Sequence, residues 1–350
     1  MFKRLSRKAR LGLAVGLAAL LGTGTGVVLY AAGNGAVRGG QLGALAWYSN
    51  NYATGTGPRG VVFDGTSIWT ANNGSSTVTK FNPTTGALIG TSILPVNSGP
   101  QAIAFDGINI WTANSLTSAV SKITAATGAV VGTYLLPAGS SPRAIVFDGS
   151  NIWTANSNAS SVSKFNTATG AVVGTYSLPA GSAPSGIAFD GISLWTANYG
   201  GNSVSKINTF TGAVVGTYSL PAGSVPSGIA FDGTNIWTAN FGGNSVSKIN
   251  PSTGAVIDTF SLPAGSGPLG IVLDQPGYSV NTGRDINPET YMWVTNYGRN
   301  SVSKIEVDTG TVIATYPVGV QPYGVAFDGT NIWVTNSFAT SSTLTKIQAR

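Results

Sequence analysis

The chain has 350 residues, of which only 9% are charged, and it contains neither histidine nor cysteine. This composition excludes Ser-His-Asp and Cys-His catalysis, disulfides and thiolate metal sites. The net charge of +6 does not indicate a nucleic-acid partner, because five of the 18 basic residues lie within the first ten positions and the remainder is close to neutral.

Residues 1–33 have the layout of an export signal, with a basic start followed by an uncharged run from Leu11 to Val37. Small residues at Ala31 and Gly33 suit cleavage after Gly33. The same run is long enough for a retained membrane anchor, since ~20 residues span a bilayer. Both alternatives predict an extracytoplasmic protein, secreted or anchored, that meets the membrane only through this segment. Residues 34–42 are then a short tether.

A repeat of seven copies dominates residues 43–350. Each of the first six copies contains four short segments rich in β-branched and aromatic residues, which in the fourth copy read GIAFD, LWTAN, SVSKIN and AVVGTYSL. The copies start near a repeated proline: Pro58, Pro100, Pro142, Pro184, Pro226, Pro268 and Pro322. Four strands recurring every ~40 residues predict an all-β fold, a seven-bladed β-propeller of four-stranded antiparallel blades.

The last copy ends at SSTLTKIQAR and lacks a fourth strand. Before the first copy, the spacing from Gly43 to Pro58 matches the spacing from Gly170 to Pro184 within one residue. We therefore expect residues 43–53 to supply the outer strand of the last blade, so that an N-terminal strand closes the ring.

Residues present in every copy are best explained by what each blade needs. We expect the repeated Asp to accept hydrogen bonds in a turn, the repeated Trp to pack between blades, and the repeated Asn to cap a strand end. The acids outside the repeat do not converge, so the sequence predicts no catalytic residue, no metal site and no cofactor: Asp258, Asp285, Glu289, Glu306 and Asp308.

Two positions vary between otherwise similar copies and should lie on one face. The first follows the repeated proline, and the second follows the repeated asparagine. We predict that this face binds a glycan or peptide through an aromatic arc opposite a cationic arc, with these residues: Tyr199, Phe241, Tyr297, Tyr323, Arg59, Arg143 and Gln101. Alternatively, the aromatic residues only cover neighbouring loops and blades.

An insertion, residues 275–292, interrupts the sixth copy between its first two strands. It should project from the opposite face. Three roles are compatible with the insertion: it docks a protein partner, it binds Ca²⁺, or it is a loop that the fold tolerates without a function of its own.

The motif WVTN at Trp293–Asn296 and Trp333–Asn336, followed by Val-Ser-Lys-Ile and Thr-Gly, resembles the YVTN-repeat family of bacterial β-propellers. The chain is more distantly similar to streptogramin lyases, a resemblance that implies Mg²⁺-dependent chemistry with catalytic His and Glu. No histidine exists here to carry over. The sequence therefore favours an exported non-catalytic binding module, although a metal-dependent lyase or lactone hydrolase and a structural cell-surface protein remain alternatives.

Overall fold

The structure is a computed structural model that describes residues 50–274 and 290–349. The predicted leader and tether, the start of the predicted closing strand and most of the insertion lie outside the described residues. Within the described ranges, no helix has the length and apolar character needed to cross a membrane.

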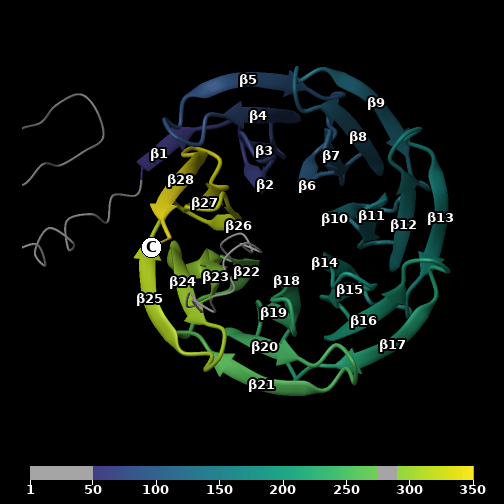
Figure 1. The fold of residues 1–350 in the computed structure, drawn as a ribbon, viewed down its shortest axis with the longest axis vertical. Coiled ribbons are helices and arrows are strands. Elements are labelled where there is room, and N and C mark those ends of the chain that lie inside the picture. The colour runs from purple at the N-terminus through teal and green to yellow at the C-terminus, as the bar shows by residue number, and fades with distance from the viewer. Residues whose placement is uncertain (1–49, 275–289, 350) are drawn as a thin grey trace, which may run out of the picture. The chain divides into compact units, whose positions relative to one another are not determined.

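The described residues form seven four-stranded antiparallel sheets around a central axis (Figure 1). The first strand of each sheet lies nearest the axis and begins at the repeated proline: β2 (Pro58–Phe63), β6 (Pro100–Phe105), β10 (Pro142–Phe147), β14 (Pro184–Phe189), β18 (Pro226–Phe231), β22 (Pro268–Leu273) and β26 (Pro322–Phe327). The second strand ends at the repeated asparagine: β3 (Ile68–Asn72), β7 (Asn109–Asn114), β11 (Asn151–Asn156), β15 (Ser193–Asn198), β19 (Ile236–Asn240), β23 (Tyr291–Asn296) and β27 (Asn331–Asn336).

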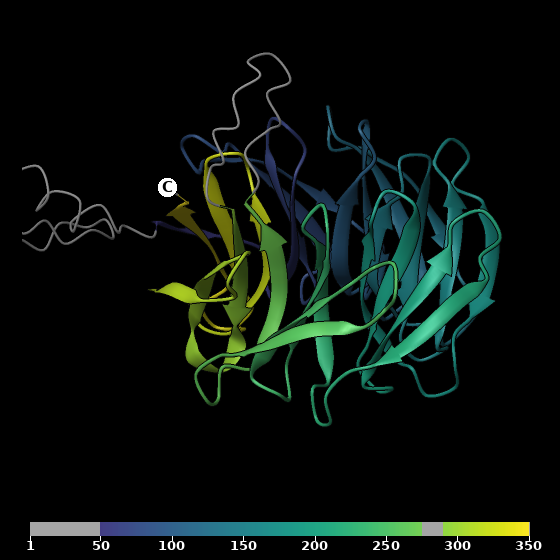
Figure 2. The same cartoon turned by 60° about the horizontal axis from the view of Figure 1, so that its bottom comes forward.

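The outer half of each blade holds two further strands. The third strands are β4 (Thr77–Phe81), β8 (Ala119–Thr124), β12 (Ser161–Asn166), β16 (Ser203–Asn208), β20 (Ser245–Ile249), β24 (Ser301–Glu306) and β28 (Thr343–Gln348). The fourth are β5 (Leu88–Ile93), β9 (Val130–Leu135), β13 (Val172–Ser177), β17 (Val214–Ser219), β21 (Val256–Ser261), β25 (Val312–Pro317) and β1 (Asn50–Ala53). A short 3₁₀ turn, η2 (Tyr297–Arg299), follows β23. The predicted seven-bladed propeller is confirmed, with its loops gathered at two faces (Figure 2).

Strand β1 closes the ring by pairing with β28 in the last sheet. The ring of Tyr52 lies 5.9 Å from that of Trp333, and the Thr345 hydroxyl donates to the Asn51 side chain. The prediction that an N-terminal strand supplies the missing outer strand is therefore confirmed. Closure leaves no blade without a neighbour, which removes the exposed sheet ends of an open stack.

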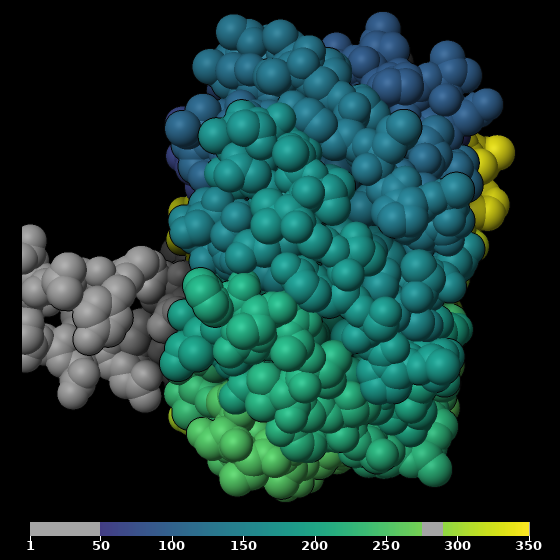
Figure 3. All heavy atoms as spheres, turned by 90° about the vertical axis from the view of Figure 1, so that its right-hand side faces the viewer, coloured from purple at the N-terminus to yellow at the C-terminus, as the bar shows by residue number. Residues whose placement is uncertain are grey.

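The hydrophobic core lies between adjacent blades. One cluster joins Trp69 and Val78 of the first blade to Ile110 and Ile123 of the second, and all four side chains are fully buried or nearly so. The equivalent cluster recurs around the ring, so the predicted packing of Trp between blades is confirmed. Viewed from the rim, successive blades form one continuous surface (Figure 3).

The repeated Asp binds the repeated Trp as well as its own turn. In every blade the carboxylate Oδ2 accepts a hydrogen bond from the tryptophan Nε1 at 2.6–2.9 Å. The other oxygen accepts turn amides, as Asp106 Oδ1 does from Ile108 N at 2.8 Å. The predicted turn hydrogen bond is confirmed, and each carboxylate is hydrogen-bonded within its own blade.

The repeated Lys joins each blade to the next through what we call the lysine clasp. Its Nζ donates to a backbone carbonyl of the following blade at 2.7–3.0 Å and lies 4.9–5.4 Å from the centroid of its own blade's Trp ring. Lys346 donates to Pro83 and so connects the last blade to the first. The carbonyl and the aromatic face therefore both offset the desolvation cost of the partly buried ammonium group.

The repeated Asn is a bridge between strands and not the strand-end cap that we expect from the sequence. Asn198 Nδ2 donates to the hydroxyls of Ser203 and Ser205 at 3.0 and 2.8 Å, and its Oδ1 accepts from Thr196 at 2.9 Å. Because the side chain is fully buried, it needs these side-chain partners on the next strand and on its own.

Two blades lack one of these contacts. Val294 and Val334 stand where the first five blades have a threonine donor. Accordingly, the buried Oδ1 atoms of Asn296 and Asn336 have no hydrogen-bond partner among the described residues.

Replacing Val294 by Thr should raise the free energy of unfolding by about 1 kcal/mol, because the new hydroxyl can donate to the orphaned Asn296 oxygen without a change in side-chain shape. Chemical denaturation measures the effect. Thr196→Val in the fourth blade is the matched reverse change and should lose a similar amount. A loss of stability in both variants would contradict the explanation.

The Asp64 and Asp106 carboxyls make folding depend on pH. Burial raises the pKa of each, but the hydrogen bonds from the tryptophan and the turn outweigh burial and leave the pKa below its ordinary value of 3.8. A depressed folded pKa contributes stability above the unfolded pKa, and this contribution is lost as pH falls through the folded pKa. The free energy of unfolding should therefore decrease from about pH 4 downward, and less steeply in Asp106→Asn. An identical slope in that variant would contradict this assignment.

Candidate ligand pocket on the propeller axis

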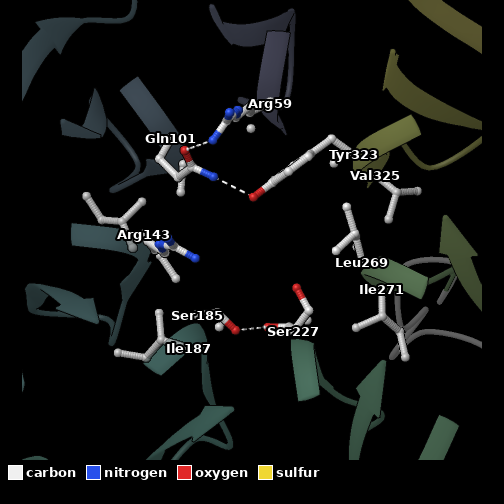
Figure 4. Close-up of a pocket in the computed structure, with 18 of the residues that line it drawn as sticks. Arg59, Gln101, Arg143, Ser185, Ile187, Ser227, Leu269, Ile271, Tyr323 and Val325 are labelled. Atoms are coloured by element: carbon white, nitrogen blue, oxygen red, sulfur yellow. Dashed lines mark hydrogen bonds between the residues drawn. The ribbon is translucent and has the colours of Figure 1, made fainter. Parts of the chain in front are cut away.

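A pocket of about 230 Å³ lies on the axis and is lined by the first strand of every blade (Figure 4). Each strand contributes three consecutive residues, beginning with the one after the repeated proline. We call the first layer the upper ring: Arg59, Gln101, Arg143, Ser185, Ser227, Leu269 and Tyr323. It coincides with the first variable position of the repeat.

A β-bulge places each upper-ring side chain in the channel. In the third blade Pro142 pairs with Asn156 and Ala144 pairs with Ala155, so Arg143 is left out of the ladder. A register shift occurs at this point in all seven blades. Bulges commonly re-aim a side chain in this way. The residue after the proline can therefore vary without disturbing the ladder.

Three predicted ligand residues form one connected group on neighbouring blades. Arg59 Nη1 donates to the side-chain Oε1 of Gln101, whose side-chain Nε2 donates to the Tyr323 hydroxyl (Figure 4). The Arg59 guanidinium carbon lies 5.3 Å from the centroid of the Tyr323 ring. Because Gln101 is only 4% exposed, these contacts fix its orientation. The sequence places Arg59 and Tyr323 on opposing arcs, but the structure brings them into contact because the last blade adjoins the first.

Arg143 differs from Arg59. Its side chain is exposed and points into the pocket from the side opposite Leu269 (Figure 4). No hydrogen bond or ion pair joins its guanidinium to another residue that the structure describes. Among the residues that the structure describes, the pocket lining contains no carboxylate, so none of them compensates the positive charges of the two arginines within it.

The third layer is an aliphatic collar beneath the upper ring, whose side chains pack into the clusters between blades and present only their edges to the pocket, the four most buried being 8% exposed: Val61, Ile103, Ile145, Ile187, Ile229, Ile271 and Val325. Between the two rings lie only glycine and alanine. At Gly228 a Cβ atom would stand 2.2 Å from the Leu269 carbonyl oxygen, so the close approach of the inner strands requires glycine there. Sequence reasoning missed the collar, although Val or Ile occurs three positions after the repeated proline in every copy.

The other three predicted aromatic residues do not line the pocket. Tyr199, Phe241 and Tyr297 follow the second strands, which stand one layer farther from the axis. The pairing of Pro184 with Asn198 puts them on the same face as the upper ring. The rings of Tyr199 and Phe241 are 6.4 Å apart, and Phe241 lies over Gly267 at the start of the next blade. These contacts agree with a covering role, and a ligand role stays a prediction.

The donor set does not fit the Mg²⁺ site that the streptogramin-lyase resemblance implies. The lining offers neither carboxylate nor imidazole, whereas hard cations prefer several carboxylate oxygens. Over residues 50–274 and 290–349, no three His, Cys, Asp or Glu side chains gather closely enough to hold a metal ion.

Comparison with known proteins gives a family and a fold. A family model described as the virginiamycin B lyase family matches residues 52–284. A search of curated proteins gave no significant match. The match to the YVTN-repeat propellers stays a prediction.

Several solved structures share the fold. Virginiamycin B lyase from Staphylococcus aureus has a TM-score of 0.72 at 22% identity, covering 87% of this chain and 100% of its own. A catalytically inactive variant of that enzyme with quinupristin gives 0.71 at 23% identity, with coverages of 86% and 98%. Hydrazine synthase from Kuenenia stuttgartiensis gives 0.66 at 19% identity, with coverages of 90% and 99%. At these identities the likeness shows the fold alone.

Proposed function

The chain belongs to the virginiamycin B lyase family, and from this premise we propose that it is a non-catalytic member that binds a ligand in the axial pocket. The observation that carries the proposal is the upper ring. The residues that every blade shares are used within and between blades, whereas the residues after the repeated proline, which differ between blades, converge on one pocket. Convergent polar groups above an apolar floor are typical of small-ligand sites.

The ligand we propose is a peptide or glycan with one end in the pocket. Its body would cross the pocket face toward Tyr199 and Phe241, whose rings offer apolar surface. The proposed location is outside the cytoplasm, which rests on the sequence of residues 1–33 alone.

A peptide and glycan array with the purified protein tests this function. We expect a small set of hits that disappear in Ser227→Phe, because Ser227 lines the pocket and the larger side chain would fill it. Ser177→Phe is the matched control, since Ser177 is exposed on the outer strand β13. Hits that persist in Ser227→Phe, or an array without hits, would contradict the proposal.

Family membership favours a second candidate, metal-dependent cleavage of a cyclic peptide lactone such as virginiamycin B. The pocket residues do not supply the ligands that this chemistry implies, and we derive no catalytic step. Incubation with virginiamycin B and Mg²⁺, followed by mass spectrometry, separates the two functions. We expect the lactone to stay intact, and linear product that chelation abolishes would establish the lyase instead.

A further inference from the structure

The axial pocket has two chemically distinct levels. The upper ring carries Arg59 and Arg143, with no carboxylate in the part of the lining that the structure describes, and the aliphatic collar lies directly beneath. The two levels are separated by a single small residue per strand. An occupant that fits both levels must carry negative charge and an apolar group within a few atoms of each other.

The two arginines are not equivalent. Arg59 already donates to Gln101 and stacks on Tyr323, so its guanidinium is held against one wall. Arg143 projects into the pocket two blades away, and its guanidinium makes no hydrogen bond or ion pair to another residue that the structure describes. A planar guanidinium binds a carboxylate through two parallel hydrogen bonds, which are stronger than hydrogen bonds between neutral groups.

We propose that the pocket takes a terminal carboxylate joined to a short branched aliphatic group, with Arg143 binding the carboxylate and the collar receiving the aliphatic group; this rests on the proposed binding function. The aliphatic group enters first and leaves the charged end at the level of the upper ring. Its size fits, because a cavity of about 150 Å³ holds benzene and this pocket has about 230 Å³.

The carboxylate could come from a free branched-chain acid or from a peptide that ends in Leu. Isothermal titration calorimetry with 4-methylpentanoate and with acetyl-Gly-Gly-Leu, each as the acid and as the amide, separates these sources. We expect each binding acid to be at least about tenfold tighter than its amide, because the amide cannot pair with a cation. Binding of both acids, or of only one of them, identifies the source and supports the proposal.

Arg143→Gln should weaken acid binding at least about tenfold and remove the preference for acid over amide. Arg299→Gln is the matched control, because it removes the same charge from the loop after β23 and outside the lining. Both variants are first compared with the wild type by thermal unfolding, so that loss of binding is not confused with loss of fold.

Equal affinity for acid and amide, or unchanged affinity in Arg143→Gln, would overturn the carboxylate assignment. Array hits restricted to neutral glycans would overturn it too, while leaving the proposed binding function in place. Failure of every array ligand and every titrated acid would overturn both.

Discussion

A chain that begins at residue 54 should have a free energy of unfolding about 5 kcal/mol smaller than a chain that begins at residue 50. The shorter chain loses β1, and with it the hydrogen bonds that β1 makes to β28. It also loses the Tyr52 ring from the cluster that contains Trp333 and Leu344. Truncation of a fully buried aromatic residue costs about 3–5 kcal/mol. Tyr52 is partly buried and supplies less than that, and the lost pairing of β1 with β28 supplies the rest.

Chemical denaturation of the two truncated chains measures this difference. The chain from residue 50 keeps the closing strand and serves as the control. Tyr52→Ala in the full chain should reproduce much of the loss, since the backbone pairing of β1 remains. Equal stability of the two truncated chains would mean that β1 does not contribute to the closed ring.

Replacing Asp106 by Ala should lower the free energy of unfolding by about 3 kcal/mol. The substitution leaves the Nε1 donor of Trp111 without its acceptor, and Trp111 is fully buried. The amides of Ile108 and Asn109 lose their carboxylate acceptor in the same step. A buried donor without a partner costs about 1–3 kcal/mol, and hydrogen bonds to a charged group are stronger than neutral ones.

Asp258→Ala is the matched control, because Asp258 is exposed on β21 and, among the described residues, accepts a hydrogen bond only from the adjacent Thr259 amide. It should change the free energy of unfolding by less than about 0.5 kcal/mol. Tryptophan fluorescence and urea denaturation report on both variants. A similarly small effect at Asp106 would show that water replaces the lost acceptor.

The fold could be predicted because every blade uses the same residues for the same structural roles. Proline marks the start of the inner strand, Asp and Gly make the first turn, and Trp fills the space between blades. Comparison of the seven copies therefore shows which positions every blade needs. The exact role of Asn could not be predicted, because its partners are side chains on another strand and depend on register.

The site could be predicted only in part. Variation at the position after the proline correctly points to side chains in the channel, since the bulge frees that position from pairing. The position after the repeated asparagine varies in the same way, but its residues follow the second strands, which lie farther from the axis than the strands that line the pocket. The sequence does not predict the Arg59–Gln101–Tyr323 group, because this group depends on side-chain lengths across three blades and not on any pattern within one.

The lysine clasp allows the number of blades to change in evolution. Most clasps span the same sequence separation, 45 residues, so each blade presents nearly the same surface to its successor. Gain or loss of one whole repeat would add or remove a blade, and the lysine and the carbonyl of each new junction would still be present. Such an event would widen or narrow the axial pocket in a single genetic step.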